Sequence, residues 1–342
     1  MKKEFAATIC CPFCRGNRLP RLPGSPAHVE LAVREEDARE VREGEITCSA
    51  CGRVFPVRAG IPDFLDRGDE ALAREVHGWA ELAGHLHEGM VAQVAALPVF
   101  PHLPWPHVGP DFFQIFEHVD FAGGRVIDVG AGRTWSTRFL VTIGRAREAV
   151  AVDALTTRFL GLETAEIFFE QDRSFFERLR ADIHHLPLPD GWADAVFSCA
   201  AIHHSGDLDA LFAEIARVLR PGGTLVFVCE PAKRAAIAGN VPQNEETAVG
   251  INEHFYSLAE YMTALRRAGL RARRLVPRTI AYRLLYPDVN LLGAAPPEVR
   301  WLARRRRGRA LLQRLLHTRA GGAWLYRRWS LPLSVVAVKP AR

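Results

Sequence analysis

Apolar runs alternate with amphipathic segments throughout the chain from Gly124 onward. Between the runs, apolar residues recur every three or four positions, as in "DLDALFAEIARVL" over 207–219, whose leading acid suits a helix N-cap. The runs expected to form strands are Arg125–Val129, Ala149–Val152, Arg178–Asp182, Ala195–Cys199, Thr224–Glu230, Leu270–Ile280 and Leu333–Val338. This alternation predicts an α/β fold with a doubly wound, Rossmann-like, seven-stranded sheet.

The pattern before Gly124 is different. Residues 1–66 are rich in Cys, Pro and Gly and contain short strand-like pieces. Residues 67–120 predict a helical linker or cap, in which two helices flank a connector rich in Pro, His and Trp. The third part, 121–342, is the predicted α/β domain, with a basic helical insert at 285–330. Within it, Pro221-Gly222-Gly223 is expected to stop a helix and turn the chain into the next strand.

The strongest local signal in residues 1–66 is a double Cys-x2-Cys pattern. "CPFC" supplies Cys11 and Cys14, and "CSAC" supplies Cys48 and Cys51. Two such turns can point four thiolates at one tetrahedral zinc ion, and a closed four-thiolate site is structural because it leaves no open coordination position. The long interval between the pairs calls for a hairpin or a small helix. The alternative is two unrelated turns with free thiols.

The end of this segment also supports a zinc ribbon. "CSACGRVFPVRAGIPDFL" over 48–65 resembles the zinc-ribbon family typified by the small activator subunit of eukaryotic tRNA and protein methyltransferases. The resemblance covers roughly the first 65 residues. Because ribbons of that family bind a methyltransferase, the resemblance favours a methyltransferase in the rest of the chain.

Composition places the chain among ordinary globular proteins. Hydrophobic residues make up 48% and charged residues 24% of the sequence. No apolar run is long enough to span a membrane, and the basic N-terminus lacks the apolar segment of a secretory signal, so we expect a cytoplasmic protein. In that compartment the seven cysteines indicate metal ligands or buried thiols rather than disulfides.

A small-residue loop follows the first predicted strand of the α/β domain, in "RVIDVGAGRTWST" over 125–137. A dinucleotide fingerprint requires a small residue where Trp135 stands, and we expect its indole to wedge the helix away from the strand. A P-loop would need Gly-Lys-Ser/Thr after the turn. The acid and the Gly-x-Gly turn instead suit S-adenosylmethionine (SAM), whose amino acid end carries an amine and a carboxylate.

Acids at the ends of the next strands support this cofactor. Asp153 is placed to accept from both ribose hydroxyls, and Asp182 from the adenine amino group. Here the sequence resembles class I SAM-dependent methyltransferases, notably the ubiquinone-type and small-molecule group, over about residues 120–280. The matching motifs run from Asp182 to Val196 and through "LFAEIARVLRPGGTLVF". The expected cofactor-binding residues are Asp128, Gly130, Ala131, Gly132, Asp153, Asp182, Ile183 and Cys199.

Methyl transfer needs alignment, and a base if the acceptor is a hydroxyl. The candidate bases are His204, after the fourth predicted strand, and His254 in "GINEHFYS", after the fifth; each has an alternative role in packing or as substrate wall. The fourth strand ends in Ser198-Cys199-Ala200-Ala201 rather than the Asn/Asp-Pro-Pro-aromatic motif of many base methyltransferases. That argues against this one class of nucleic-acid methylation.

The C-terminal part is strongly basic. Residues 266–342 carry a formal net charge of +17, against −12 for the remainder. The segment 299–330 predicts an arginine-rich helix with a leucine stripe. It could be a solvated packing helix, a peripheral surface for an anionic membrane or lipid-linked phosphate, or an RNA contact. The predicted function is methylation of a small-molecule, glycan or lipid-linked acceptor. An rRNA or tRNA methyltransferase and a non-catalytic binding or activator protein are the alternatives.

Overall fold

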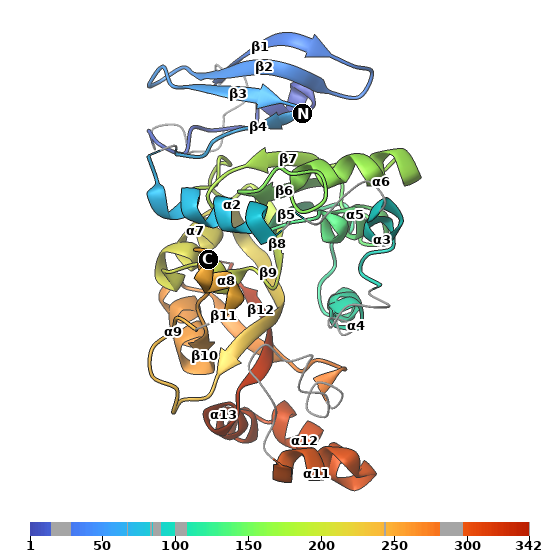
Figure 1. The fold of residues 1–342 in the computed structure, drawn as a ribbon, viewed down its shortest axis with the longest axis vertical. Coiled ribbons are helices and arrows are strands. Elements are labelled where there is room, and N and C mark those ends of the chain that lie inside the picture. Colours follow the sequence, from blue (N-terminus) through green and yellow to red (C-terminus); the bar gives the residue numbers. More distant parts are fainter. Residues whose placement is uncertain are drawn as a thin grey trace.

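The computed structural model describes residues 1–14, 29–66, 68–82, 84, 90–99, 108–242, 244–280 and 297–341. Its parts follow one another along the long axis of the molecule: a small N-terminal sheet, a larger mixed sheet flanked by helices, and a group of basic helices at the opposite end (Figure 1). Within the described residues, none of the helices is both long and apolar enough to cross a membrane.

The N-terminal sheet is antiparallel, with strand order β1-β2-β3-β4. Its strands are β1 (Val29–Glu36), β2 (Val41–Cys48), β3 (Val54–Arg58) and β4 (Ile61–Pro62), and they follow the short helix α1 (Lys3–Ala6). Ile46 on β2 and Phe55 on β3 are register partners, and both are buried. Of the two elements expected between the cysteine pairs, the structure forms the hairpin, β1 and β2.

The larger sheet has the strand order β11-β12-β9-β8-β5-β6-β7, with β10 beside β9. The strands are β5 (Arg125–Val129), β6 (Glu148–Asp153), β7 (Glu177–Arg180), β8 (Ala193–Cys199), β9 (Leu219–Lys233), β10 (Tyr256–Ser257), β11 (Arg271–Leu275) and β12 (Leu331–Val338). Neighbouring strands are parallel except for β12, which runs antiparallel to β9 and β11. The predicted fold class is confirmed, while the strand expected to reach Ile280 ends at Leu275.

Helices cover both faces of the larger sheet. The helices after the N-terminal sheet, including those at the far end of the molecule, are α2 (Glu70–Leu82), α3 (Val91–Ala95), α4 (Val108–Phe113), η3 (Gln114–Glu117), α5 (Trp135–Thr142), η4 (Leu162–Thr164), α6 (Ala165–Asp172), η5 (Ile202–His204), α7 (Leu208–Val218), α8 (Glu245–Ala248), α9 (Leu258–Arg267), α11 (Pro297–Arg304), α12 (Arg306–His317) and α13 (Arg319–Arg328). The predicted helix at 207–219 is α7, and Asp207 caps it by accepting from the amide of Ala210.

The predicted turn at Pro221-Gly222-Gly223 appears as an irregularity within β9: the pairing with β8 passes from Ala193–Leu219 to Ala195–Thr224, and Gly222 has a φ of 78°. The helix already ends at Val218, and these three residues belong to β9. The amide of Gly222 donates to the carbonyl of Lys339, and the amide of Lys339 donates to the carbonyl of Gly223. Hydrogen bonds with the chain that follows β12 therefore hold this irregular segment in place.

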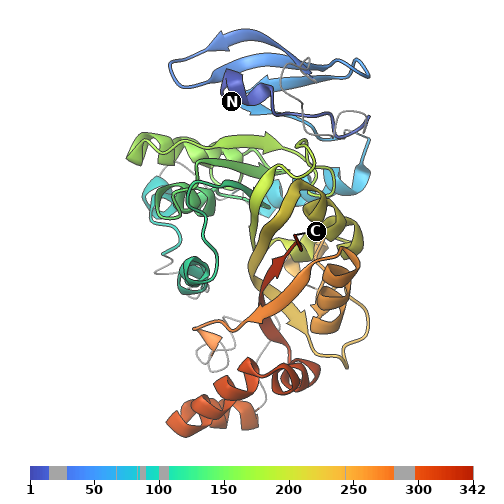
Figure 2. The same ribbon diagram turned by 180° about the vertical axis from the view of Figure 1, so that it is seen from behind.

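The N-terminal sheet lies against the β7 edge of the larger sheet (Figure 2). Asp63 and Arg180 form a parallel bridge, and the amide of Phe64 donates to the carbonyl of Arg180 at 2.8 Å. Beneath this contact, the fully buried guanidinium of Arg178 donates to Glu40 at 2.6 Å and to Glu166 at 2.8 Å. Backbone pairing and buried charge thus join the two sheets.

Candidate functional site

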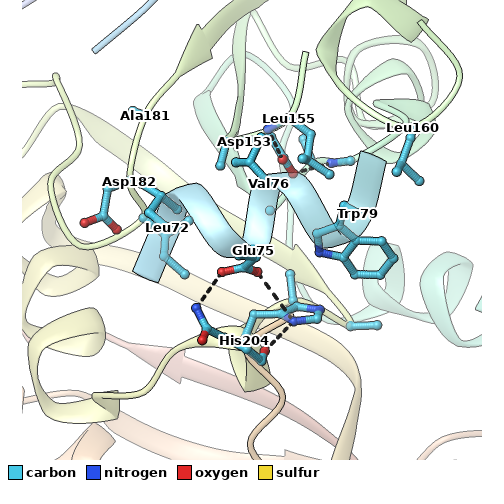
Figure 3. Close-up of a pocket in the computed structure, with 18 of the residues that line it drawn as sticks. Leu72, Glu75, Val76, Trp79, Asp153, Leu155, Leu160, Ala181, Asp182 and His204 are labelled. Atoms are coloured by element: carbon cyan, nitrogen blue, oxygen red, sulfur yellow. Dashed lines mark hydrogen bonds and ion pairs between the residues drawn. The ribbon is translucent and has the colours of Figure 1, made fainter. Parts of the chain in front are cut away.

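A pocket of about 570 Å³ opens at the carboxyl ends of β5, β6, β7 and β8. The strand order reverses at β5, which lies between β6 and β8. Doubly wound sheets bind their ligands at such a switch point. Helix α2 crosses over the pocket and presents Leu72, Glu75, Val76 and Trp79 to it (Figure 3).

The glycine loop after β5 forms the floor of the pocket. Gly130 and Gly132 have φ angles of 68° and 46°, which favour glycine. A Cβ on Gly130 would lie 2.3 Å from the Cβ of Ala201, so no side chain fits there. The amides of Gly130 and Ala131 donate to the carbonyl of Val152, which fixes the loop against the end of β6.

Asp153 at the end of β6 lines the pocket with a buried carboxylate. Its Oδ2 accepts from the amide of Gly132 at 2.7 Å, and its Oδ1 accepts from the amide of Leu155 at 2.8 Å. Burial raises the pKa of this carboxyl despite these hydrogen bonds. Each oxygen keeps a further lone pair, so the carboxylate suits a pair of vicinal hydroxyls.

Asp128 lies behind the loop and is not among the residues that line the pocket. Its Oδ2 accepts from the hydroxyls of Ser136 and Thr137, both at 2.6 Å, and burial raises its pKa to about 6. This carboxylate therefore anchors the first turn of α5. The other seven residues expected to bind the cofactor all line the pocket: Gly130, Ala131, Gly132, Asp153, Asp182, Ile183 and Cys199.

Trp135, at the start of α5, is buried without wedging the helix from the sheet. Its ring packs edge-on against Phe112 of α4, with 4.9 Å between ring centroids. The indole therefore points into the cluster between α4 and α5. The expected wedging is wrong because a partner outside the strand–helix turn accommodates the ring.

Asp182 and His184 form the wall after β7. The Oδ1 of Asp182 lies 2.8 Å from the Nδ1 of His184, whose Nε2 lies 2.8 Å from the hydroxyl of Ser205. Burial opposes ionisation of Asp182, but hydrogen bonds from His184 and its charge outweigh burial and lower the pKa of Asp182. An ionised carboxylate here can accept from an exocyclic amine.

The turn after β8 is held by buried carboxylates. His203 lies between Glu230, 2.7 Å from its Nδ1, and Glu253, 3.4 Å from its Nε2. Burial opposes protonation, but the charge of Glu230 and its hydrogen bond prevail and raise the pKa of His203 to about 10. His203, His204 and Glu253 are close enough to share a metal ion, yet both Nδ1 atoms already contact oxygen partners. These contacts explain why the three side chains lie together: they hold the turn after β8 in place.

Both predicted bases line the pocket. The Nδ1 of His204 donates to the carbonyl of Asn252 at 2.8 Å, which leaves Nε2 as the proton acceptor. Burial and the charge of His203 lower the pKa of His204 to about 4. His254 stacks on Tyr256, and burial lowers its pKa as well. Its Nδ1 is buried and has no hydrogen-bond partner among the described residues.

Three charged residues of the pocket did not emerge from the sequence pattern, and one of them is Asp69, which precedes α2. Glu75 comes from α2, and Arg133 follows the glycine loop. The signal for Glu75 was available: Leu72, Glu75, Val76 and Trp79 lie three and four positions apart and form one helix face. An acid within such an apolar stripe indicates a buried carboxylate. Nothing in the sequence of α2 indicates which site that face would cover.

The second candidate site is the cysteine cluster beside the N-terminal sheet. The sulfur atoms of Cys11, Cys14, Cys48 and Cys51 all lie within 4.8 Å of one another. The Cys11–Cys51 and Cys14–Cys48 distances are 3.8 and 3.6 Å. A tetrahedral zinc ion with Zn–S bonds near 2.3 Å requires S–S edges of about 3.8 Å, so the donor set fits zinc. Cys10 is buried and lies outside the cluster.

Two families match the chain. Residues 127–227 match the family described as methyltransferase domain, and residues 2–60 match the Trm112p-like protein family. The first match contains β5 to β8 and much of the pocket, and the second contains all four clustered cysteines. The two matches thus correspond to the two candidate sites.

Curated relatives include methyltransferases of bacterial origin. The 27-O-demethylrifamycin SV methyltransferase of Amycolatopsis mediterranei is 33% identical over 44% of this chain and 54% of its own length. Methyltransferase GfsG of Streptomyces halstedii is 28% identical over 68% of this chain and 89% of its own length. The chain spans about half the length of the first curated relatives it matches.

Among solved structures, the [4+2]-cyclase SpnF has a TM-score of 0.51 and 20% sequence identity, over 79% of this chain and 96% of its own. At that identity the likeness concerns the fold alone. This neighbour is named for a cyclisation, so proteins of this fold are not limited to methyl transfer.

Proposed function

We propose that this chain, which joins a class I SAM-dependent methyltransferase domain to a Trm112-like zinc ribbon, transfers a methyl group from SAM to a small-molecule acceptor. The observation that carries the proposal is the row of groups along the strand ends: a glycine loop after β5, Asp153 after β6 and Asp182 after β7. Their order fits the amino acid, ribose and adenine portions of one extended cofactor.

The residues present fit SAM. Asp153 would hold the ribose hydroxyls, and Asp182 with Ile183 would bind the adenine. Burial lowers the pKa of Arg133, which lines the pocket and has no ion-pair partner among the described residues, so its guanidinium suits the cofactor carboxylate. When bound, SAM supplies an electrophilic methyl group. The protein then has to align the acceptor and hold its proton.

His254 is the better placed of the two predicted bases if the acceptor is a hydroxyl. A general base works best when its pKa lies near the operating pH. The pKa of about 4 makes His204 a weak acceptor, although its tautomer is correctly fixed. The Cε1 and Nε2 atoms of His254 lie beside Gly206 at the pocket wall, whereas its Nδ1 is buried without a partner among the described residues. We therefore assign to His254 the role of taking the proton from the acceptor hydroxyl, and to His204 the role of positioning the substrate.

The relatives support a small-molecule acceptor. The rifamycin relative is named for O-methylation of a natural product, and this favours a small organic hydroxyl over RNA. A glycan or lipid-linked acceptor belongs to the same class of chemistry. In this proposal the zinc is structural, because all four of its ligands are cysteines.

The test is a methylation profile of small metabolites and of RNA, using SAM labelled on the methyl carbon. Cell extract is incubated with the protein or with its Asp153→Ala variant. We expect label in the small-molecule fraction with the unaltered protein and little with the variant. Label in RNA would support the nucleic-acid alternative. SAM binding without any labelled product would support a non-catalytic binding protein.

We further propose that α11–α13 contact an anionic membrane. Trp301 and Trp324 are 55% and 47% exposed, with Arg305 and Arg328 stacked over their rings. The arginines of these helices have no ion-pair partner within the described ranges. Indole rings flanked by cations suit the headgroup layer of a bilayer. Figure 1 places these helices at the end of the molecule opposite the ribbon.

Vesicle binding tests this surface. We expect vesicles with anionic lipid, and not neutral ones, to retain the protein, and the binding to disappear when Arg304–Arg307 become Gln. A matched control replaces the same number of exposed arginines on α9 and β11: Arg266, Arg267, Arg271 and Arg273. Equal losses in both variants would mean a non-specific charge effect. Salt-sensitive RNA binding without vesicle binding would favour the nucleic-acid alternative.

A further inference from the structure

Glu75 is a buried carboxylate on the pocket wall that lacks a cationic partner. Its side chain is 15% exposed, and Figure 3 shows it pointing from α2 toward His204. The Oε2 accepts from the side-chain amide of Asn252 at 2.9 Å, and Trp79 provides a second neutral hydrogen bond. Buried carboxylates are normally paired with a positive charge.

The titratable groups around Glu75 do not supply that charge. His204 lies 3.7 Å away, but its pKa of about 4 leaves it neutral at pH 7. Asp153 on β6 and Glu253, between α8 and β10, are acids, and their charges add to the effect of burial. The charge of His203 is balanced by its own partners, Glu230 and Glu253. Burial is the largest cause, and together with these carboxylates it raises the pKa of Glu75 to about 7, although the two hydrogen bonds act in the opposite direction.

The order of the strands indicates which end of the cofactor Glu75 faces. This step rests on the proposed function. With the adenine at Asp182 after β7 and the ribose at Asp153 after β6, the amino acid end continues toward β5 and β8. His204 and Asn252, the contacts of Glu75, line that same end of the pocket. The sulfonium joins the ribose to the amino acid, so Glu75 lies on the side where the positive sulfur belongs.

We propose that Glu75 supplies the counter-charge for the sulfonium and thereby makes the pocket prefer SAM over S-adenosylhomocysteine. The two ligands share the adenosine, the amine and the carboxylate, and they differ in the methyl group and in the charge on sulfur. A carboxylate that faces the sulfur therefore favours the methyl donor over the spent product. Glu75 is a specificity-determining residue, contributed by a helix outside both matched families.

A proton signature follows from this assignment. A positive charge brought within several ångströms of a carboxyl lowers its pKa. Near pH 7, where Glu75 is only partly ionised, SAM binding should release a fraction of a proton per site, and S-adenosylhomocysteine should not cause this release. SAM affinity should accordingly rise as the pH rises through 7. Comparison with the Glu75→Gln variant cancels the titration of the ligands themselves.

Calorimetry in buffers of different ionisation enthalpy tests the proposal on the full chain. We expect Glu75→Gln to weaken SAM binding roughly tenfold, to change S-adenosylhomocysteine binding less than twofold, and to abolish the extra proton release. Glu70→Gln is the matched control, because Glu70 lies on the same helix with a side chain that is 91% exposed. It should behave like the unaltered protein.

The outcomes separate this inference from the proposed function. If the unaltered protein binds neither ligand, the methyltransferase proposal fails. If both ligands bind and Glu75→Gln weakens them equally, or weakens neither, the cofactor assignment stands and the role of Glu75 is refuted. Should Glu75→Gln destabilise the fold, Glu75→Asp keeps the charge on a shorter side chain. That variant must then retain the proton release and part of the preference for SAM.

Discussion

The cysteine cluster and the strand-end pocket are assembled in opposite ways. The cluster takes its four ligands from two short turns, each encoded by a few consecutive residues. The pocket takes its lining from the ends of four strands and from α2, which lies more than fifty residues before the glycine loop. One site depends on a metal to hold local turns together. The other depends on the long-range pairing of strands in the larger sheet.

The largest expected effect concerns the metal. Structural zinc contributes about 10–16 kcal/mol of apparent binding energy in small zinc domains, and that energy is folding energy. The purified protein should carry about one zinc per chain. Cys48→Ser should release it and unfold the N-terminal sheet, as measured by metal analysis and hydrogen exchange. Cys10→Ser is the control, because Cys10 is buried but lies outside the cluster.

If the two sites are independent, SAM binding should survive in Cys48→Ser. Loss of SAM binding together with the zinc would break the contrast between a metal-dependent and a metal-independent site. A fully folded protein without metal would contradict the zinc assignment itself.

The next largest effect lies where the two sheets meet. Arg178→Met should lower the free energy of unfolding by about 3–5 kcal/mol, because it removes buried, charge-assisted hydrogen bonds to both Glu40 and Glu166. Denaturant unfolding measures this change. Arg34→Met removes an exposed pair with Glu45 and should change stability by less than about 1 kcal/mol. Equal effects of the two variants would mean that the buried ion pairs between the two sheets do not stabilise the protein.

A smaller effect is expected for the pocket alone. Asp153→Ala should weaken SAM binding by about 1–3 kcal/mol, since two ribose hydroxyls lose their acceptor. Calorimetry measures the loss, and Asp120→Ala, on an exposed turn, is the control. Zinc content should not change in either variant. Equal binding of NADH and SAM by the unaltered protein would overturn the cofactor assignment.

The smallest effect tests how α2 is seated over the pocket. A Cβ on Gly78 would lie 2.6 Å from the carbonyl oxygen of Val249, so Gly78→Ala must displace the helix or the loop. We expect a few-fold loss in SAM affinity and about 1–3 kcal/mol of destabilisation. Gly84→Ala is the comparison, because a Cβ there meets nothing within 4 Å. Unchanged affinity in Gly78→Ala would show that the helix position does not matter to the pocket.

This contrast explains what the sequence could predict. Cys11 and Cys14 were recognisable as a ligand pair because two residues of spacing already fix a turn. Asp153 and Asp182 were recognisable because parallel strands bring their carboxyl ends to one edge. The doubly wound fold class of the larger sheet follows from the same alternation of strands and helices.

Other residues were beyond reach for physical reasons. Asp128 ends a strand as Asp153 does, but its side chain faces α5 rather than the pocket, and sequence does not tell which side of the loop a carboxylate serves. The apolar stripe of α2 indicates that Glu75 is buried, but the pocket that it enters depends on the long-range docking of α2, which has no local signature. Arg178 is fully buried only because the N-terminal sheet covers it.

The pairing of Asp63 and Phe64 with Arg180 has a consequence for the solubility of the chain. Strand β7 is the outermost strand of its sheet, and an open edge strand is a template for pairing with another molecule. The N-terminal sheet covers part of that edge. A chain shortened to the part that contains the larger sheet would expose the free backbone groups of β7 and the arginines beneath them. Such a fragment would be prone to edge-to-edge aggregation even with its pocket intact. By covering part of the β7 edge, the N-terminal sheet therefore limits self-association.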